Sequence, residues 1–229
     1  MTVFDGIKVP KILFETQSKY NGNIQVVQVG ETRKIKVDRF EQSVNHQSPT
    51  CKNLVWGRFI EILKEEETDL KSILLLGLGG GTVAHLVSES YPDADIVSVE
   101  IDQVMVDIAK QYFDLDQIKN HRVIVDDALR VVVEPETFEL VPASFQAVYV
   151  DIFIGEKYPD LGSSGNFVAA VKRMIAPGGL VVFNRIYLTH HQDEVNTFVD
   201  SLSDYFTGIK CQVVAGHTNS DNILIYGRV

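Results

Sequence analysis

Ile73-Leu-Leu-Leu-Gly77-Leu-Gly79-Gly80-Gly81-Thr82 is the most informative segment of the chain. An apolar run of strand-forming residues ends in a glycine-rich turn, and a helical pattern follows from residue 83 to residue 90. Glycine tolerates positive φ and lets a ligand approach the backbone closely. The helix N-terminus behind the turn presents free N–H groups and the positive end of a dipole. This order of strand, turn and helix predicts a nucleotide site.

After this turn, segments typical of strands alternate with segments of helical periodicity. The expected strands cover 73–76, 96–99, 122–125, 147–150, 180–183, 210–214 and 222–228. The expected helices cover 83–91, 104–113, 128–132, 167–174 and 191–206. This alternation predicts an α/β fold with a doubly wound, mostly parallel, seven-stranded Rossmann-like sheet.

The first 53 residues have a different pattern, typical of short strands and turns. The β-branched residues gather in 12–16, 24–29 and 33–37, with turn signals at Asn21-Gly22-Asn23 and Gly30-Glu31. A helical segment then covers 54–64. We therefore expect an N-terminal β-hairpin region over residues 1–53 and a Rossmann-like nucleotide-binding catalytic domain over residues 54–229.

Composition limits the class of protein. The chain has 229 residues, of which 45% are hydrophobic and 23% are charged, as in ordinary globular proteins. No apolar run approaches the ~20 residues of a membrane span, and the first residues do not resemble a secretion signal. Cys51 and Cys211 are therefore expected to be free thiols of a cytoplasmic protein.

The net charge of −10 argues against binding to nucleic acid, which requires clustered Lys and Arg. An acidic surface suits a cationic substrate, although acidity for solubility alone is the better explanation of the charge. His190-His191 has no Cys or carboxylate at a suitable spacing, so we expect a helix start there and no metal site.

Two later features distinguish between nucleotides, after an acid that several kinds of nucleotide site share. Glu100 ends the second strand about 20 residues after the glycine turn, where an acid meets a ribose hydroxyl pair. Asp127 follows the third strand and is positioned for an adenine amino group; a helix N-cap is the alternative, and Asp126 competes for either role. Ala176-Pro177-Gly178-Gly179-Leu180 forms a tight turn into the fifth strand. Together with Gly77, Gly79 and Gly81, this set resembles the class I S-adenosylmethionine-dependent transferase fold.

The N-terminal segments carry a more specific resemblance. Phe14-Glu15-Thr16-Gln17-Ser18-Lys19-Tyr20 and Val37-Asp38-Arg39-Phe40-Glu41-Gln42-Ser43 are similar to the opening hairpins of spermidine synthases, the polyamine aminopropyltransferases. Val99-Glu100-Ile101-Asp102, Val125-Asp126-Asp127-Ala128-Leu129 and Val148-Tyr149-Val150-Asp151 extend the resemblance. The resemblance implies S-adenosylmethionine or its decarboxylated form as cofactor, Gln42 among the cofactor-binding residues, and a homodimer.

The resemblance also implies a chemistry. That family transfers an aminopropyl group from a sulfonium to an amine, and the amine needs a nearby carboxylate to take its proton. The family's carboxylate corresponds to Asp151, which follows the fourth strand; a turn or helix-capping role is the alternative. The segment from Ile152 to Ser164 would form a lid, or an ordinary surface connection.

The residues implied for the polyamine depart from the family pattern. Gly79 and Ile154 stand where the family has carboxylates, and Asn21 stands after Tyr20 where it has Gln. A late tyrosine loop is replaced by His217-Thr-Asn-Ser-Asp-Asn222. A buried dication needs paired carboxylates, so putrescine should be a poor acceptor, and Ile154→Asp with Gly79→Asp should improve aminopropyl transfer.

Three hypotheses of function therefore remain open. The first is a spermidine-synthase-like group transferase that acts on a small, amine-bearing acceptor with Asp151 as base. The second is a small-molecule methyltransferase that uses the same nucleotide site. The third is a non-catalytic binding protein.

Trp56 would line the cofactor pocket or, more simply, pack in the core.

Overall fold

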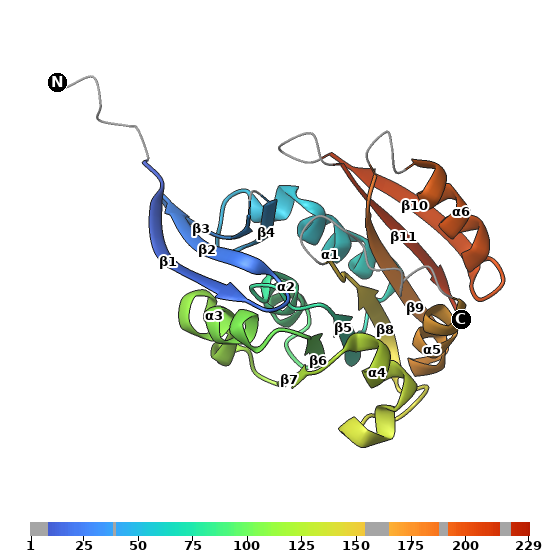
Figure 1. Ribbon diagram of the computed structural model, residues 1–229. Helices are drawn as coiled ribbons and strands as arrows, with labels where there is room; N and C mark the ends of the chain where they lie inside the picture. The colour runs from blue at the N-terminus through green and yellow to red at the C-terminus, as the bar shows by residue number, and fades with distance from the viewer. Residues whose placement is uncertain (1–8, 39, 154–164, 188–191, 216–220) are drawn as a thin grey trace.

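The computed structural model describes residues 9–38, 40–153, 165–187, 192–215 and 221–229 (Figure 1). The predicted lid, including Ile154, lies almost wholly outside these ranges, as do His190, His191 and most of the 217–222 segment. Within the described ranges, no helix is long and apolar enough to cross a membrane. Cys51 is buried and Cys211 is exposed, and both are free thiols as expected.

A seven-stranded sheet with the order β10-β11-β9-β8-β5-β6-β7 forms the centre of the molecule. Its strands are β5 (Ser72–Leu76), β6 (Asp95–Glu100), β7 (His121–Val125), β8 (Phe145–Val150), β9 (Ile175–Ile186), β10 (Thr207–Val214) and β11 (Asn222–Arg228). The pairs among β5 to β9 are parallel, whereas β11 pairs antiparallel with both β9 and β10. The predicted doubly wound sheet is confirmed.

The direction in which successive strands are added to the sheet reverses between β5 and β8, which are parallel neighbours. The chain proceeds outward from β5 through β6 to β7, and then returns to pair β8 with the other side of β5. Open α/β sheets bind ligands at such a switch point, beyond the carboxyl ends of the strands. The fold therefore predicts a ligand site at the residues that follow β5 and β8.

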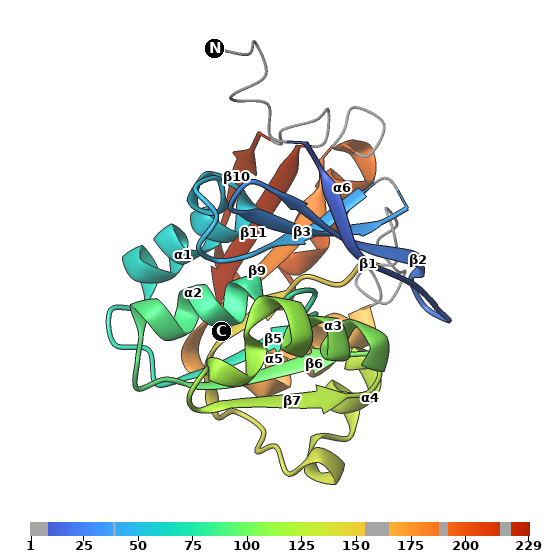
Figure 2. The same ribbon diagram turned by 90° about the vertical axis from the view of Figure 1, so that its left-hand side faces the viewer.

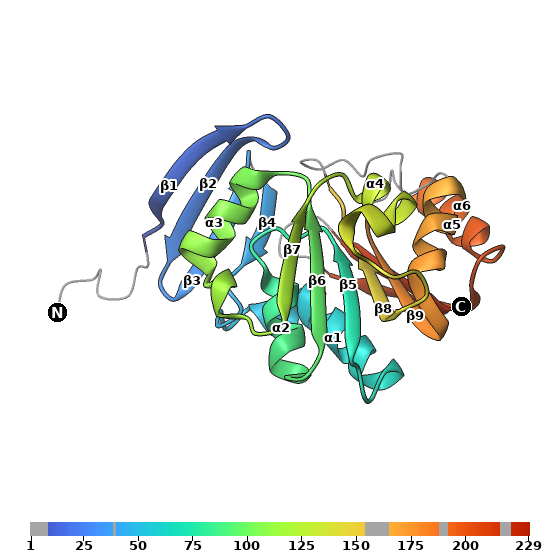
Figure 3. The same cartoon turned by 90° about the horizontal axis from the view of Figure 1, so that it is seen from below.

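Helices cover both faces of this sheet. They are α1 (Val55–Glu66), α2 (Thr82–Ser90), α3 (Gln103–Phe113), α4 (Ala128–Val133), α5 (Gly165–Met174) and α6 (Gln192–Leu202), with short 3-10 helices at Cys51–Asn53, Leu115–Gln117 and Pro135–Phe138. Figure 3 shows α1 and α2 on one side of the strands and α4, α5 and α6 on the other. Each layer buries its own apolar cluster against the sheet, and Trp56 is 7% exposed in the α1 cluster, as a core residue would be.

A second, antiparallel sheet precedes the central one and has the order β1-β2-β3-β4. Its strands are β1 (Lys11–Ser18), β2 (Gly22–Val29), β3 (Thr32–Val37) and β4 (Phe40–Val44). Its inner residues, such as Ile24 and Ile35, join Ile108 and Phe113 of α3 in one apolar cluster. The two sheets are thus linked through α3, beside which the small sheet lies (Figure 2). The predicted boundary after residue 53 stays a prediction.

The main differences from the sequence predictions are at two element boundaries. Residues 40–44 form a fourth N-terminal strand, which the polar sequence of this segment did not mark as a separate strand. Asp38, with φ 53°, makes the reversal before it without a glycine. The last helix ends at Leu202, before the predicted residue 206. Residues 203 to 205 form turns instead.

The Pro-Gly-Gly segment, predicted as a tight turn before the strand, lies within β9 as an irregularity of its pairing with β8. Phe145 pairs with Ile175 and Ala147 pairs with Leu180, so four residues, 176–179, lie opposite a single residue of β8. A Cβ on Gly179 would lie 2.7 Å from the carbonyl oxygen of Gln146, which explains the glycine at that position. The extra residues bend the start of β9 at the edge of the sheet opposite to the switch point.

His121 gives the fold a testable pH dependence. Its Nε2 is 2.8 Å from the Ser98 hydroxyl, and burial together with nearby His85 lowers its pKa from 6.5 to about 4. Below pH 6.5 the unfolded chain takes up a proton here, whereas the folded chain does not until about pH 4. Stability at this site is therefore lost as the pH falls through that interval.

We expect His121→Gln to remove about 1–2 kcal/mol of the difference in unfolding free energy between pH 7 and pH 5. Urea denaturation of the variant and the wild type at both pH values measures this difference. An identical pH dependence in the two proteins would contradict the buried, neutral state of His121.

Candidate active site

The glycine turn after β5 takes a conformation that requires its glycines. Gly77, Gly79 and Gly81 have φ values of 101°, 54° and 79°. A Cβ on Gly77 would lie 2.1 Å from the carbonyl oxygen of Asp151, because the chain leaving β5 passes directly against the chain leaving β8. Gly77 N donates to the carbonyl of Val99, which fixes the turn to β6 as well. The turn is therefore held between both neighbouring strands.

Strand β4 lies against this turn. Ser43 Oγ accepts a hydrogen bond of 2.8 Å from Gly80 N, and Thr82 Oγ1 donates one of 2.6 Å to the carbonyl of Val44. Gln42, predicted to bind the cofactor, precedes Ser43 and is half-buried beside the turn. The N-terminal sheet thus takes part in building the site, a role of Ser43 that the sequence analysis missed.

The same contact argues against one sequence-based expectation. A Cβ on Gly79 would lie 2.6 Å from Ser43 Oγ, and the φ of 54° strains any L side chain there. Gly79→Asp would therefore disturb the turn before it could contribute a carboxylate to an aminopropyl group. Gly79→Asp is therefore not expected to improve aminopropyl transfer.

Glu100 lies at the end of β6 with its carboxylate under the turn. Oε2 accepts from Leu78 N at 3.2 Å and from Gly79 N at 3.3 Å, and Oε1 accepts from Asp102 N at 3.0 Å. Burial raises the pKa of Glu100, and these three N–H donors act against that rise. A carboxylate has about four lone-pair sites, so Glu100 supports the turn and can still accept a ribose hydroxyl.

Asp102 is a further residue of this edge to which the sequence analysis gave no role. It caps α3 through a 3.0 Å bond from Val104 N to its Oδ1. Its Oδ2 accepts from the Ser18 hydroxyl and, at 2.7 Å, from Asn21 Nδ2. Asn21, implied as a substrate-binding residue, therefore has its side-chain amide on Asp102. An Asp two residues after a strand-ending Glu was the sequence signal for this anchor.

Asp127 follows β7 and occupies the N-cap of α4, because its Oδ1 accepts a 2.8 Å bond from Leu129 N. The capping alternative is thus present in the structure, and contact with adenine stays a prediction that would use the other oxygen. Asp126 pairs with Arg130 at 2.7 Å. That ion pair makes Asp126 the weaker candidate for a ligand contact.

Asp151 follows β8 and has a defined set of partners. Asn184 Nδ2 donates to its Oδ1 at 2.7 Å, and Asn222 Nδ2 donates to Asn184 Oδ1 at 2.9 Å. Burial raises the pKa of Asp151 from 3.8 to about 6, while Asn184 and Tyr149 act against the rise. At neutral pH the carboxylate is therefore ionised, yet more basic than an exposed one. Asn184 was detectable in the sequence as a polar residue that ends the apolar run of β9.

The predicted acceptor-binding residues are brought together only in part. Tyr20 is 38% exposed at the end of the first hairpin, with Lys19 Nζ 5.3 Å from its ring centroid. Ile154 lies outside the described residues, so its role stays a prediction. The described residues contain no group of three or more His, Cys, Asp or Glu side chains that could hold a metal.

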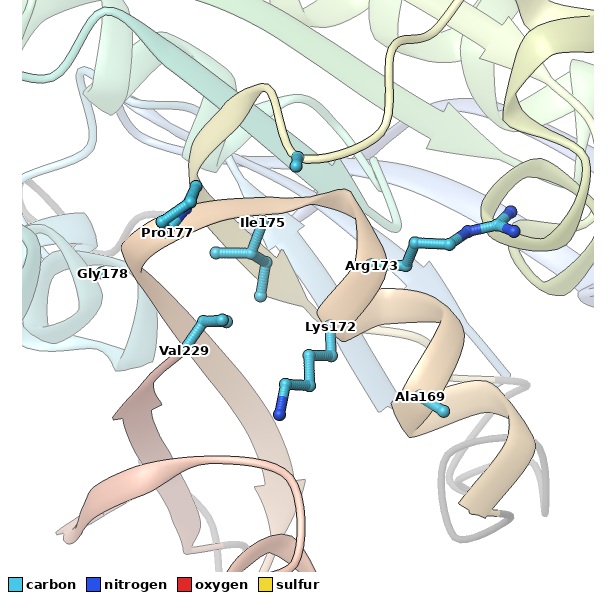
Figure 4. A pocket seen from close by; sticks show the side chains of 8 residues that line it. Ala169, Lys172, Arg173, Ile175, Pro177, Gly178 and Val229 are labelled. Carbon is cyan, nitrogen blue, oxygen red and sulfur yellow. The ribbon is translucent and has the colours of Figure 1, made fainter.

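A shallow pocket of about 570 Å³ lies elsewhere, between the start of β9 and α5. Lys172, Ile175, Pro177 and Val229 are among its lining residues (Figure 4). It adjoins the segment before β9 and hence the edge opposite to the glycine turn. The side chain of Arg173 extends away from its centre and donates to the carbonyls of Val132 and Val133. The pocket is therefore not part of the candidate active site.

Comparison with known proteins supports the same general class. Residues 73–179 match the family described as a methyltransferase domain. An eEF1A lysine and N-terminal methyltransferase homolog of Drosophila melanogaster is 35% identical over 124 residues, which are 51% of this chain and 18% of that protein. A polyamine aminopropyltransferase of Vibrio vulnificus is 30% identical over 145 residues, which are 63% of this chain and 48% of that protein. The matches thus span less than half the length of both relatives.

Solved structures agree on the fold. Spermidine synthase of Thermotoga maritima has a TM-score of 0.72 at 11% identity and covers 95% of this chain and 72% of that chain. Human methyltransferase-like protein 13 in complex with SAH has a TM-score of 0.62 at 21% identity and covers 80% of this chain and 82% of that chain. The predicted spermidine-synthase-like form of the class I S-adenosylmethionine-dependent methyltransferase fold is confirmed.

Glu100→Gln tests the double role of that residue. The amide keeps a single acceptor oxygen. At least one of the three N–H groups that donate to Glu100 would therefore face an NH2 group in the variant. We expect about 1.5–3 kcal/mol weaker binding of S-adenosylhomocysteine in calorimetry, together with a lower unfolding temperature. Glu139→Gln, at a side chain that is 86% exposed, is the matched control and should change neither value. Wild-type affinity in Glu100→Gln would refute the assignment.

Proposed function

We propose that this chain, which has the spermidine-synthase-like form of the class I S-adenosylmethionine-dependent fold, is a transferase that alkylates an amine nitrogen. The cofactor is S-adenosylmethionine or its decarboxylated form. The glycine turn, Gln42, Glu100 and Asp127 hold it, and Asp151 is the base. The acceptor is a small molecule that carries an amine.

The observation that carries this proposal is the place and state of Asp151. Its main-chain carbonyl lies against Gly77 in the turn, so the base and the cofactor cradle are built from adjoining residues. Its pKa of about 6 makes it a carboxylate at neutral pH that is a better proton acceptor than an exposed aspartate. A turn-capping role alone would not require the part-buried hydrogen bond from Asn184.

The reaction is a displacement at a carbon attached to sulfonium sulfur. The acceptor nitrogen forms the new C–N bond with its lone pair, the C–S bond breaks, and its electrons return to sulfur to give a thioether. The nitrogen loses one proton, which Asp151 accepts. An aliphatic amine with a pKa near ~10 is protonated in water, so a carboxylate beside it both attracts the ammonium form and accepts its proton.

Aminopropyl transfer and methyl transfer remain two candidate forms of this reaction. The resemblance of the N-terminal hairpins favours aminopropyl transfer, as does the name of the Vibrio relative. The absence of a carboxylate at Gly79 favours methyl transfer, as does the name of the Drosophila relative. Both names describe modification of nitrogen in amines, which is the common part of the proposal. A non-catalytic binding protein is the third candidate, and the partners of Asp151 count against it.

Asp151→Asn provides the test of the base. We expect turnover to fall about 10²- to 10⁴-fold, because general-base assistance contributes a factor of that size, while S-adenosylhomocysteine affinity stays within about threefold of wild type. The assay incubates protein with either cofactor and a panel of amines, and product mass identifies the group transferred. Putrescine should be a poor acceptor.

The same variant has an internal control for folding. The pKa of Asp151 is higher in the folded chain than the ordinary 3.8, so its ionisation at pH 7 opposes folding. Asp151→Asn should therefore unfold at the same or a higher temperature than wild type. An Asp151→Asn protein with full activity would remove the proposed base, and brisk spermidine formation by the wild type would contradict the altered polyamine site.

We further propose that the protein is a cytoplasmic homodimer in which the N-terminal sheet contributes to the interface. Ile12 of β1 is 54% exposed, and Phe40 of β4 is 39% exposed. Ile12→Glu should weaken association, because it places a charge on the apolar outer strand. Light scattering at micromolar concentration measures the mass, and a monomeric wild type would contradict the proposal.

A further inference from the structure

Tyr149 is a buried polar residue to which the proposed reaction gives no role. It lies on β8, two residues before Asp151, and is 1% exposed. Its ring stacks on Phe59 of α1 with the ring centroids 4.1 Å apart. Packing therefore fixes the ring, and the hydroxyl cannot turn out to solvent.

The hydroxyl of Tyr149 has no hydrogen-bond partner of full geometry among the described residues. A buried polar group without a partner costs about 1–3 kcal/mol, whereas a phenylalanine would fill almost the same volume without that cost. Asp151 directly follows β8, and its N–H still donates to the carbonyl of Leu76 in β5, so the alternation of side chains along the strand directs residues 149 and 151 to the same side. Burial raises the pKa of Tyr149, and the charge of Asp151 and a side-chain interaction with that carboxylate raise it further.

The other side of the carboxylate is already held. Asn184 donates to Oδ1 of Asp151 at 2.7 Å, and Asn222 holds the oxygen of Asn184 at 2.9 Å. A single hydrogen bond leaves a carboxylate free to tilt about its Cβ–Cγ bond, whereas a second donor on another side fixes its plane. The Tyr149 hydroxyl is placed to be that second donor after a small shift of the hydroxyl or the carboxylate.

We propose that Tyr149 is a positioning residue: its hydroxyl donates to the ionised carboxylate of Asp151 and, with Asn184, holds that carboxylate toward the acceptor nitrogen. This inference rests on the proposed function, since the acceptor is what gives Asp151 its proton. In the described part of the chain, Tyr149 is the titratable group that acts on Asp151, and the other influences are burial and the neutral amide of Asn184. The neighbouring Phe59 of α1 and Gly77 of the turn carry no charge.

Tyr149→Phe removes only the hydroxyl and so tests this role. A donor to the ionised form is lost, so the titration midpoint of Asp151 should rise by about half to one pH unit. The measurement is ¹³C NMR of the aspartate side-chain carboxyls in the full chain without ligand, with Asp151→Asn to assign the signal. Turnover should fall about 3- to 10-fold at constant S-adenosylhomocysteine affinity, with the acid side of the pH–rate profile shifted in the same direction.

Tyr91→Phe is the matched control. The Tyr91 hydroxyl donates to the carbonyl of Glu67 at 2.7 Å, at the end of α1 and away from Asp151. This variant should unfold at a lower temperature and leave the Asp151 midpoint unchanged. Tyr149→Phe should instead raise the Asp151 midpoint and unfold near the wild-type temperature, because phenylalanine fills almost the same buried volume without a buried hydroxyl.

The positioning role of Tyr149 and the proposed function can be contradicted separately. An unchanged Asp151 midpoint in Tyr149→Phe overturns the positioning role, whatever the enzyme transfers. A raised midpoint supports that role even if the wild type transfers nothing to any amine, and in that case it is the proposed function that fails.

Discussion

The close approach of two chain segments at the switch point is the constraint on which the site depends. Gly77 leaves β5 so near to Asp151 at the end of β8 that even a methyl group at its Cα would lie 2.1 Å from the Asp151 carbonyl oxygen. Parallel pairing of β5 with β8 brings these ends together, and the positive φ of Gly77 turns the chain away before they collide. The glycine turn proposed to hold the cofactor and the proposed base are therefore built from adjoining residues.

The remaining parts of the site act on this junction from outside. Glu100 satisfies N–H groups of the turn from β6, and Ser43 satisfies another from the N-terminal sheet. Asp102 connects the same edge to the first hairpin through Ser18 and Asn21. The small sheet is thus more than an appended unit, because its loss would leave the N–H of Gly80 in the glycine turn without its partner. A specific acceptor requires such a covered edge, since water competes for every polar contact in an open one.

The central sheet was predictable because its signals are local: apolar runs, helical periodicity and glycines at fixed offsets. The place of Asp151 followed from the family resemblance and from its position directly after the fourth expected strand. The contacts of Ser43 and Asn184 and the stacking of Tyr149 on Phe59 were not predictable, because each joins elements far apart in sequence. A single serine or asparagine carries no periodic signal. Asp127 shows the opposite case, in which the local alternative of a helix cap is realised in the structure. Where long-range contacts decide a role, the sequence supplied candidates and the fold supplied partners.

The most direct test of this account compares Gly77→Ala with Gly178→Ala. Both residues have positive φ, at 101° and 76°, so both substitutions strain the backbone, but a Cβ at Gly178 meets nothing within 4 Å. Calorimetric titration with S-adenosylhomocysteine, on variants shown to be folded by circular dichroism, isolates the effect of the contact with Asp151. The account predicts near wild-type affinity for Gly178→Ala and a loss of at least about tenfold for Gly77→Ala. Wild-type affinity in Gly77→Ala would contradict it.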